Sequence, residues 1–234
     1  MAEFMPHNAP LVVLTFLFTG LLLGAAGLVV LWALAAQRYA LAVRVLVAGT
    51  VAAGVYAGTL LARSLGSEEK TLAAGQHKYF CEIDCHAAYT VTDVRTAKTL
   101  GEDAEQATAD GTFYVVTLRT WFDGETVSSR RPEGMPLWPN PRLVRVVDEA
   151  GRRYSTSLAG QKAIVARNVP LTHALRPGES YETVLVFDLP ADAASPRLLV
   201  ADRFPLSQFL IGHENSPLHR KIYFALDAAS TASR

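Results

Sequence analysis

The chain has 234 residues, with 22 Lys plus Arg and 22 Asp plus Glu, so its formal net charge is zero. This length allows one or two domains, and the balanced charge excludes the strongly basic surface of a typical nucleic-acid-binding domain. Half of the residues are hydrophobic, and they are concentrated in the first quarter of the chain, which indicates a membrane segment followed by a soluble domain.

Two long apolar runs come first. No charged residue occurs from Pro10 to Ala36, and a second apolar run extends from Val45 to Ala62. A helix of about 20 apolar residues crosses a bilayer, and in lipid only a helix pairs every backbone group of such a run. Residues 1–63 are therefore expected to form a transmembrane hairpin, with helices at about residues 10–36 and 45–62.

The orientation of the hairpin follows from its basic residues. The link between the runs carries Arg38 and Arg44, whereas the segment before the first run has no Lys or Arg. Basic residues favour the cytoplasmic side, so both chain ends are expected in the periplasm of a bacterial inner-membrane protein. A cleaved signal peptide fits poorly, because the N-terminal segment is not basic and the first apolar run is too long.

Each predicted helix carries a pair of glycines at helical spacing, Gly20 with Gly24 and Gly54 with Gly58. Small residues at this spacing let helix backbones approach closely in lipid. Two interpretations stay open: the glycines pack the hairpin on itself, or they pack it against another membrane-embedded subunit.

A linker is expected at residues 64–76, and a β-domain at residues 77–227. Short β-prone runs such as TFYVVTLRTWF and YETVLVFDL alternate with turn signals such as DEAG and LRPGES, which is typical of a β-sandwich. Residues 228–234 are small and polar and are expected to be a mobile tail.

Three stretches of this domain carry a family resemblance. In order, FYVVTLRTWF, RLVRVVDEAGRRYSTS and LRPGESYETVLVFDLP, followed by RLLV, are similar to telokin-like immunoglobulin-fold domains of bacterial envelope proteins, over about residues 87–202. The resemblance implies that this domain is an immunoglobulin-like β-sandwich. Together with the apolar runs, this makes the expected fold class a membrane-anchored all-β protein whose hairpin precedes this sandwich. Domains of this immunoglobulin-like fold class mostly serve as binding or assembly modules and share no catalytic residues, so the resemblance implies a module of that kind. Fold alone does not identify its function.

The overall layout also resembles subunit II of haem-copper oxidases. That family has a two-helix hairpin with both ends outside, then a β-domain whose Cys-x-x-x-Cys bridges a dinuclear copper centre with two His and a Met. Here Cys81 and Cys85 open the β-domain instead of lying near its end, and Met135 is the only methionine beyond the hairpin.

The stretch KYFCEIDCHAAY holds both cysteines, Cys81 and Cys85, followed by His86. On a straight strand the two cysteines would share the core face about 13 Å apart, with His86 on the other face. A disulfide requires Cα atoms about 4.4–6.8 Å apart, so joining the sulfurs requires a turn between them.

Three interpretations of this stretch stay open. The first is a disulfide between Cys81 and Cys85 in an oxidising compartment, and the second is a pair of unlinked thiols. The third is a metal site, for which thiolate ligands favour copper. Its candidate ligands are Cys81, Cys85 and His86 with one further imidazole, from His213, His219 or His77.

A long proline-rich loop, FDGETVSSRRPEGMPLWPNPR, contains Arg130, Arg131 and Trp138. Loops of this length in a compact domain are usually functional or disordered, and Trp and Arg are enriched in interface hot spots. The loop is therefore a candidate partner contact, with the alternative that it folds over its own sandwich and buries Trp138.

The sequence contains no phosphate-binding loop, zinc-protease motif or nucleophile elbow, so we expect a protein that is not an enzyme. The expected function is a non-catalytic accessory or scaffold subunit. Its periplasmic domain would dock on a larger membrane complex, with respiratory or photosynthetic electron transfer as one setting. The expected partners are membrane-embedded subunits and the lipid bilayer, not nucleic acid or a small-molecule substrate. The alternative is a periplasmic copper protein that transfers electrons or delivers copper; otherwise the cofactor is unknown.

Overall fold

The computed structural model describes residues 9–82, 84–102, 105–164 and 168–227, so the expected mobile tail at 228–234 lies outside the described residues. Contacts between backbone positions divide these residues into two units. The helical unit comprises residues 9–68 and 205–220, and the β-unit comprises residues 69–204 and 221–227. The expected order, a helical N-terminal region followed by a β-sheet domain, is confirmed.

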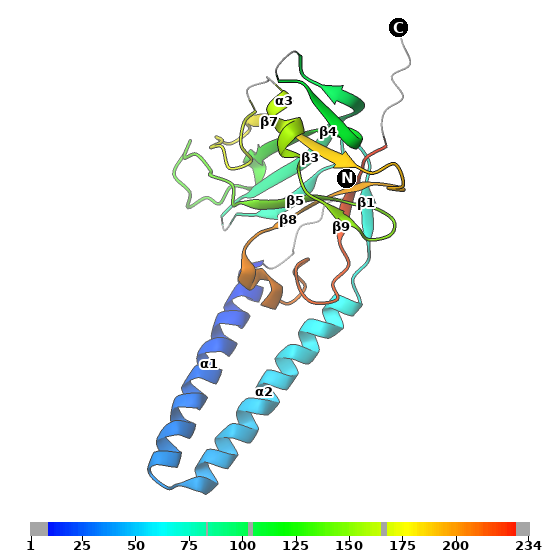
Figure 1. The fold of residues 1–234 in the computed structure, drawn as a ribbon. Helices are drawn as coiled ribbons and strands as arrows, with labels where there is room; N and C mark the ends of the chain where they lie inside the picture. The colour runs from blue at the N-terminus through cyan, green and yellow to red at the C-terminus, as the bar shows by residue number, and fades with distance from the viewer. Residues whose placement is uncertain (1–8, 83, 103–104, 165–167, 228–234) are drawn as a thin grey trace. The chain divides into compact units, whose positions relative to one another are not determined.

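The helical unit contains helices α1 (Ala9–Ala35) and α2 (Tyr39–Leu65), which run antiparallel (Figure 1). Both are long and apolar enough to cross a membrane by length and composition. Helix α2 begins six residues before the predicted start at Val45, so Arg44 lies inside it. Backbone hydrogen bonds determine where a helix begins, and Ala42 N already donates to Arg38 O. The exposed side chain of Arg44 therefore does not prevent the helix from beginning before Val45.

The β-unit has two sheets. One has the strand order β1-β9-β8-β5-β6 and the other β2-β3-β4-β7. The strands are β1 (Lys70–Leu72), β2 (Lys78–Cys81), β3 (His86–Leu100), β4 (Ala107–Asp123), β5 (Arg142–Val147), β6 (Arg153–Tyr154), β7 (Ser180–Leu189), β8 (Arg197–Asp202) and β9 (Ile222–Ala225). Short helical elements are η2 (Gly124–Thr126), α3 (Leu158–Ala163) and η3 (Pro205–Phe209), the last of which belongs to the helical unit.

The main hydrophobic core draws on both sheets. Tyr89 and Phe187 from one sheet and Val146, Leu198 and Phe224 from the other are fully buried in a single cluster. This is the layered packing of a β-sandwich, in which the inner faces of two sheets share one core. The first and last strands are neighbours, because β1 pairs in parallel with β9 through Lys70 and Ile222.

The predicted hairpin turn at DEAG is confirmed. Strands β5 and β6 pair antiparallel, with Val147 opposite Arg153. Gly151 adopts a positive φ of 79°, a conformation that glycine adopts without steric cost. The buried carboxylate of Asp148 accepts hydrogen bonds from Arg152 N and from the hydroxyl of Tyr154, so the turn is also held by its own side chains.

The segment around GHENSPLH is placed differently from the sequence boundary, which assigned it to the β-domain at 77–227. Residues 205–220 group with the helices. The ring of Phe209 stacks on that of Phe16, and the hydroxyl of Tyr56 donates to the Phe209 carbonyl (2.7 Å). These partners are about 150 residues or more away in sequence, which is why no local pattern indicated the assignment.

Candidate functional site

The Cys-x-x-x-Cys stretch forms the end of a β-hairpin. Strands β2 and β3 pair antiparallel, with Cys81 directly opposite His86. Glu82 N donates to Cys85 O (2.8 Å), so the chain reverses between these two residues. Ile83 lies outside the described residues. The turn that a Cys81–Cys85 linkage would require is therefore present.

The turn also changes which residues share a face, and here the straight-strand expectation is wrong. Directly opposed residues of an antiparallel pair point to the same side. Phe80 is opposite Ala87. Ala87 and Cys85 belong to the core cluster, and the partly buried Phe80 packs against it. Cys81 and His86 therefore share the other face. On a straight strand, all odd-numbered residues would share one face. Across the turn, each even-numbered residue of β2 is opposite an odd-numbered residue of β3, and for this reason the expectation failed.

The two thiols are not joined by a disulfide in the described structure. The side chain of Cys85 is almost fully buried, and this burial raises its pKa to about 12. Because the thiolate is the reactive and metal-binding form, Cys85 has the environment of a structural thiol. Cys81 is partly exposed on the opposite face.

The candidate copper ligands are not assembled into one site among the described residues, where no group of three or more His, Cys, Asp or Glu could hold a metal ion. Cys81 and Cys85 point to opposite faces of the hairpin. His213 and His219 belong to the helical unit, whereas Cys81, Cys85 and His86 belong to the β-unit. The Nδ1 atom of His213 accepts a hydrogen bond from Asn215 N (3.0 Å).

His86 lies in the middle of a row of three polar side chains. It is opposite Cys81 on β2 and opposite Asp123 on β4. Burial lowers the pKa of His86, and the nearby Asp123 carboxylate opposes this effect. Its backbone N donates to Thr126 Oγ1 (3.0 Å), but its Nδ1 atom is buried and has no hydrogen-bond partner among the described residues. An unpaired buried ring nitrogen is uncommon and makes His86 the most distinctive polar group of the hairpin.

The proline-rich loop is attached to this hairpin. Ser128 N donates to the Asp84 carbonyl (2.8 Å), and the Arg131 guanidinium pairs with the Asp84 carboxylate (2.6 Å). Arg131 also donates to the Pro136 carbonyl (2.9 Å), and its hydrogen bond to Asp84 lowers the pKa of that carboxyl. The Arg131 side chain is only 7% exposed, so this candidate contact residue is used to fix the loop internally.

The tip of the fixed loop faces outward. The Trp138 side chain is 64% exposed, and Met135 and Arg130 are exposed as well. Next to Trp138, Leu137 is buried and forms a two-way backbone bridge with Leu175 (2.7 and 2.9 Å). The alternative in which the loop buries Trp138 against its own sandwich is therefore wrong: the loop folds back, but it presents this indole to solvent.

A buried ion pair that the sequence analysis missed lies behind the turn. Glu82 pairs with Arg142 of β5, and the two side chains are 2% and 1% exposed. Asn140 N also donates to the Glu82 carboxylate (3.2 Å), while the Arg142 guanidinium lies over the Phe80 ring (4.1 Å). Burial raises the pKa of Glu82, although Arg142 opposes that shift.

Lys78 makes a second polar link between the two sheets. Its Nζ atom donates to the carbonyls of Val200 on β8 (2.7 Å) and Ile222 on β9 (3.0 Å). The alternation of Lys78, Phe80 and Glu82 was the available signal for this face. Because Lys78 and Glu82 are charged, the pattern suggested a solvent-exposed face of the strand. Only the position of the turn shows that this face points into the core.

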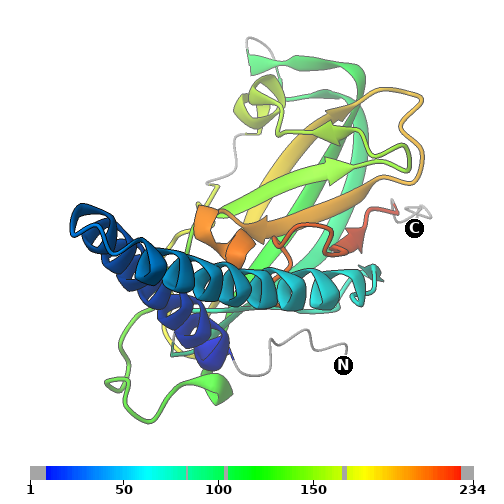
Figure 2. The same cartoon turned by 90° about the horizontal axis from the view of Figure 1, so that it is seen from below.

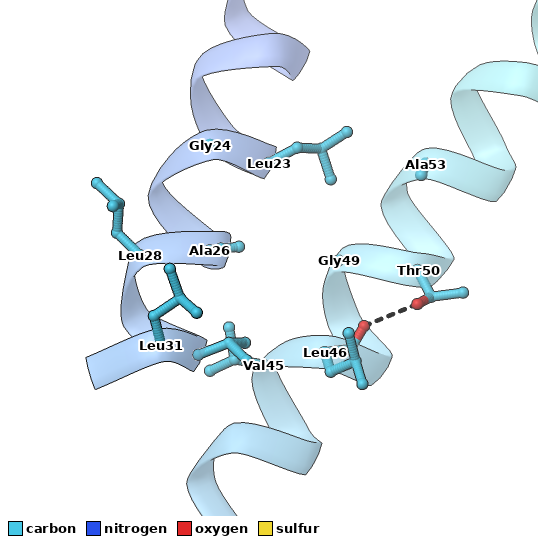
Figure 3. Close-up of a pocket in the computed structure, with 12 residues that line it drawn as sticks. Leu23, Gly24, Ala26, Leu28, Leu31, Val45, Leu46, Gly49, Thr50 and Ala53 are labelled. Atoms are coloured by element: carbon cyan, nitrogen blue, oxygen red, sulfur yellow. Dashed lines mark hydrogen bonds between the residues drawn. The ribbon is translucent and has the colours of Figure 1, made fainter. Parts of the chain in front are cut away.

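In the helical unit, the four predicted contact glycines do not close the hairpin. A Cβ atom at Gly20, Gly24, Gly54 or Gly58 would meet no atom of the described residues within 4 Å. The helices approach one another instead where Gly49 faces Leu23 and Ala26, each 3.9 Å from an added Cβ (Figure 3). Beside this contact lies an open apolar groove of about 640 Å³.

No protein-family model and no curated protein sequence matches the chain. Two solved structures match part of the chain at low sequence identity. One is MPT63, a secreted protein of Mycobacterium tuberculosis, at 11% identity and a TM-score of 0.41, covering 68% of this chain and 99% of that protein. The other is the yjhA protein of Bacillus subtilis, at 12% identity and a TM-score of 0.39, covering 67% of this chain and 100% of that protein.

Proposed function

We propose that this protein is a non-catalytic, membrane-anchored accessory subunit that packs against a larger membrane protein complex. The observation that carries the proposal is the position of the four glycines. Gly20, Gly24, Gly54 and Gly58 form two faces that allow close helix approach, yet the hairpin closes elsewhere, at Gly49. Membrane helices associate through such small-residue faces, so these two are available to other subunits.

The positions of basic and apolar residues support an inner-membrane location with both chain ends in the periplasm. Arg38 and Arg44 lie at the closed end of the hairpin and are exposed. Basic residues flanking a span favour the cytoplasmic side. Most of the large apolar side chains of α1 and α2 are exposed, which suits helices surrounded by lipid and by other helices.

The β-unit supplies a second contact surface for the same complex. Trp138 is held outward on a loop whose base is fixed by Arg131 and by the Leu137 bridge. A pre-ordered, exposed indole is a typical interface anchor, since little entropy is lost when it is buried by a partner. The two-sheet architecture is compatible with the telokin-like, immunoglobulin-fold assembly module that the sequence resembles. Respiratory or photosynthetic electron transfer stays the proposed setting.

The test is co-purification of the full chain in mild detergent, with partners identified by mass spectrometry. We expect Gly20→Leu with Gly24→Leu, and separately Gly54→Leu with Gly58→Leu, to reduce the recovered partner at least tenfold. The matched control is Ala48→Leu with Val55→Leu, which adds bulk at exposed α2 positions to the side of the face formed by Gly54 and Gly58. A partner-free monomer, or equal recovery with all three variants, would contradict the proposal.

Copper binding is the second candidate function, and one observation favours it. Cys81 lies directly opposite His86, whose buried Nδ1 has no hydrogen-bond partner in the described part of the chain. A thiolate beside an imidazole suits copper. If the purified chain binds one equivalent of copper, and Cys81→Ser loses it while Cys85→Ser keeps it, this candidate replaces the scaffold proposal.

A further inference from the structure

We infer that residues 205–219 form a membrane-inserted segment whose apolar side chains contact lipid acyl chains of the outer leaflet. The inference rests on the proposed anchoring of the chain by α1 and α2. The segment includes η3 and the GHENSPLH turn, and it belongs to the helical unit (Figure 2, orange to orange-red).

The polarity of the segment is inverted relative to a loop in water. Three of its polar residues, Ser207, Glu214 and Ser216, are buried, at 1%, 5% and 2% exposure, whereas Gln208 is exposed. Its large apolar residues face outward: Leu206 and Phe209 are nearly half exposed, and Leu218 is 67% exposed. Soluble proteins bury such apolar groups and expose such polar ones, so this arrangement indicates an apolar environment.

Several hydrogen bonds join residues within the segment, as lipid requires. Backbone bonds join Leu210 N to the Ser207 carbonyl (3.2 Å), and Ser216 N to the His213 carbonyl (2.9 Å). The hydroxyl of Ser216 donates to the Leu210 carbonyl (2.6 Å), and the Asn215 amide donates to Ser207 Oγ (2.8 Å). Irregular backbone can lie at membrane depth only when the protein pairs its polar groups in this way.

The contacts with the two helices give the depth of the segment. Phe209 stacks on Phe16 at a ring distance of 6.4 Å, and its carbonyl accepts from Tyr56. Phe16 lies six residues inside Pro10, and Tyr56 lies six residues inside Ala62, the outer ends of the two apolar runs. At about 1.5 Å per residue, both counts place the contact about 9 Å below the end of the span. The hydrocarbon half-thickness is about 15 Å, so Phe209 lies within the acyl region.

The end of the segment returns to the level expected for the headgroups. Arg220 N donates to Ser67 Oγ (2.8 Å), and Ser67 lies five residues beyond Ala62 on the outer side of α2. The Arg220 side chain is exposed there, next along the chain to the exposed apolar turn containing Leu218. A cation at the headgroup level beside apolar groups at the acyl level is the pattern of an interfacial segment.

The test uses the full chain in bacterial membranes, with the photoreactive residue p-benzoylphenylalanine placed singly at Leu206, Phe209 or Leu218. Leu21, an exposed residue of α1, is the control for membrane anchoring, and Leu158, the 79% exposed first residue of α3 in the β-unit, is the control for water. After irradiation, we expect lipid adducts by mass spectrometry at Leu206, Leu218 and Leu21, at yields at least tenfold above that at Leu158. Phe209 contacts Phe16, so Leu206 and Leu218 decide the result if that substitution disturbs folding.

The possible outcomes separate this inference from the proposed function. Lipid adducts at Leu21 but not at Leu206 and Leu218 overturn the membrane-inserted segment and leave the anchor intact. Adducts of Leu206 and Leu218 with another protein also overturn it, because the apolar face is then a subunit contact. Absence of lipid adducts at Leu21 as well overturns the anchoring and, with it, the segment.

Discussion

The buried pair of Glu82 and Arg142 makes a quantitative prediction. Replacing Arg142 with Leu leaves the Glu82 carboxylate without its cation at a site where the side chain is 2% exposed. Removal of one partner of a buried ion pair costs about 3–5 kcal/mol. The loss of the guanidinium over Phe80 adds about 0.5–2 kcal/mol, and the Asn140 hydrogen bond to Glu82 offsets part of the total. We therefore expect the free energy of unfolding of the β-unit to fall by about 4 kcal/mol.

The assay is thermal unfolding of the full chain in detergent, followed by near-ultraviolet circular dichroism. At about 2–4 °C per kcal/mol for a domain of this size, the melting temperature of Arg142→Leu should fall by about 8–16 °C. The double variant Glu82→Gln with Arg142→Leu should recover at least half of the loss, because it removes the buried charge at residue 82, and Asp202, the other carboxylate beside Arg142, is 20% exposed. The control is Arg119→Leu, which breaks an exposed pair with Glu182 worth about 0–1 kcal/mol.

The pH dependence of the same variant has a defined sign. Burial raises the pKa of Glu82, and loss of Arg142 removes an effect that lowers it. A carboxyl group whose pKa is raised by folding stabilises the folded state at pH values below its ordinary pKa of 4.5. This stabilisation is lost as the pH rises through the pKa of the folded state. The loss of melting temperature caused by Arg142→Leu should therefore be smaller at pH 5 than at pH 8.

Equal melting temperatures for Arg142→Leu and Arg119→Leu would refute the reasoning, since the buried pair would then contribute no more stability than a surface pair.

Three further predictions concern the β-unit. The pKa of Cys85, about 12 instead of 9.0, reduces its thiolate fraction at pH 8 by about 1,000-fold. Iodoacetamide should therefore label Cys81 in the folded chain and reach Cys85 only after denaturation; rapid labelling of native Cys85 would contradict its burial. Asp84→Asn should loosen the proline-rich loop and increase proteolysis near Arg130, whereas Glu133→Gln, on the exposed part of the same loop, should not. Since Arg131 lowers the Asp84 pKa, the stability from this pair is present above about pH 4 and lost as pH falls through the lower folded value, so acid should remove the difference between Asp84→Asn and the parent. Gly111→Ala should lower stability by about 1–3 kcal/mol in thermal unfolding, because its Cβ would overlap the Leu189 carbonyl oxygen, whereas Gly134→Ala, with open space around it but a positive φ of 67°, should cost about 1 kcal/mol.

The features that the sequence predicted well are local. The two apolar runs and the DEAG turn need only neighbouring residues, and both are present in the structure. The inward face of Lys78 and Glu82 was not predicted, because it depends on the reversal at the turn and on Arg142, 60 residues from Glu82. The grouping of Phe209 with the helices likewise depends on Tyr56, 153 residues away. Local patterns do not contain such pairings, which arise only when distant segments meet.

The pairing of β1 with β9 has a consequence for biogenesis. Lys70–Leu72 emerges from the ribosome soon after α2, but its partner Ile222–Ala225 is among the last segments to be synthesised. At about 5–20 residues per second, roughly 150 residues take about 8–30 s to make. During that interval β8, which also pairs with β9, presents an open edge. Chains interrupted before residue 222 should therefore be strong substrates for chaperones and proteases.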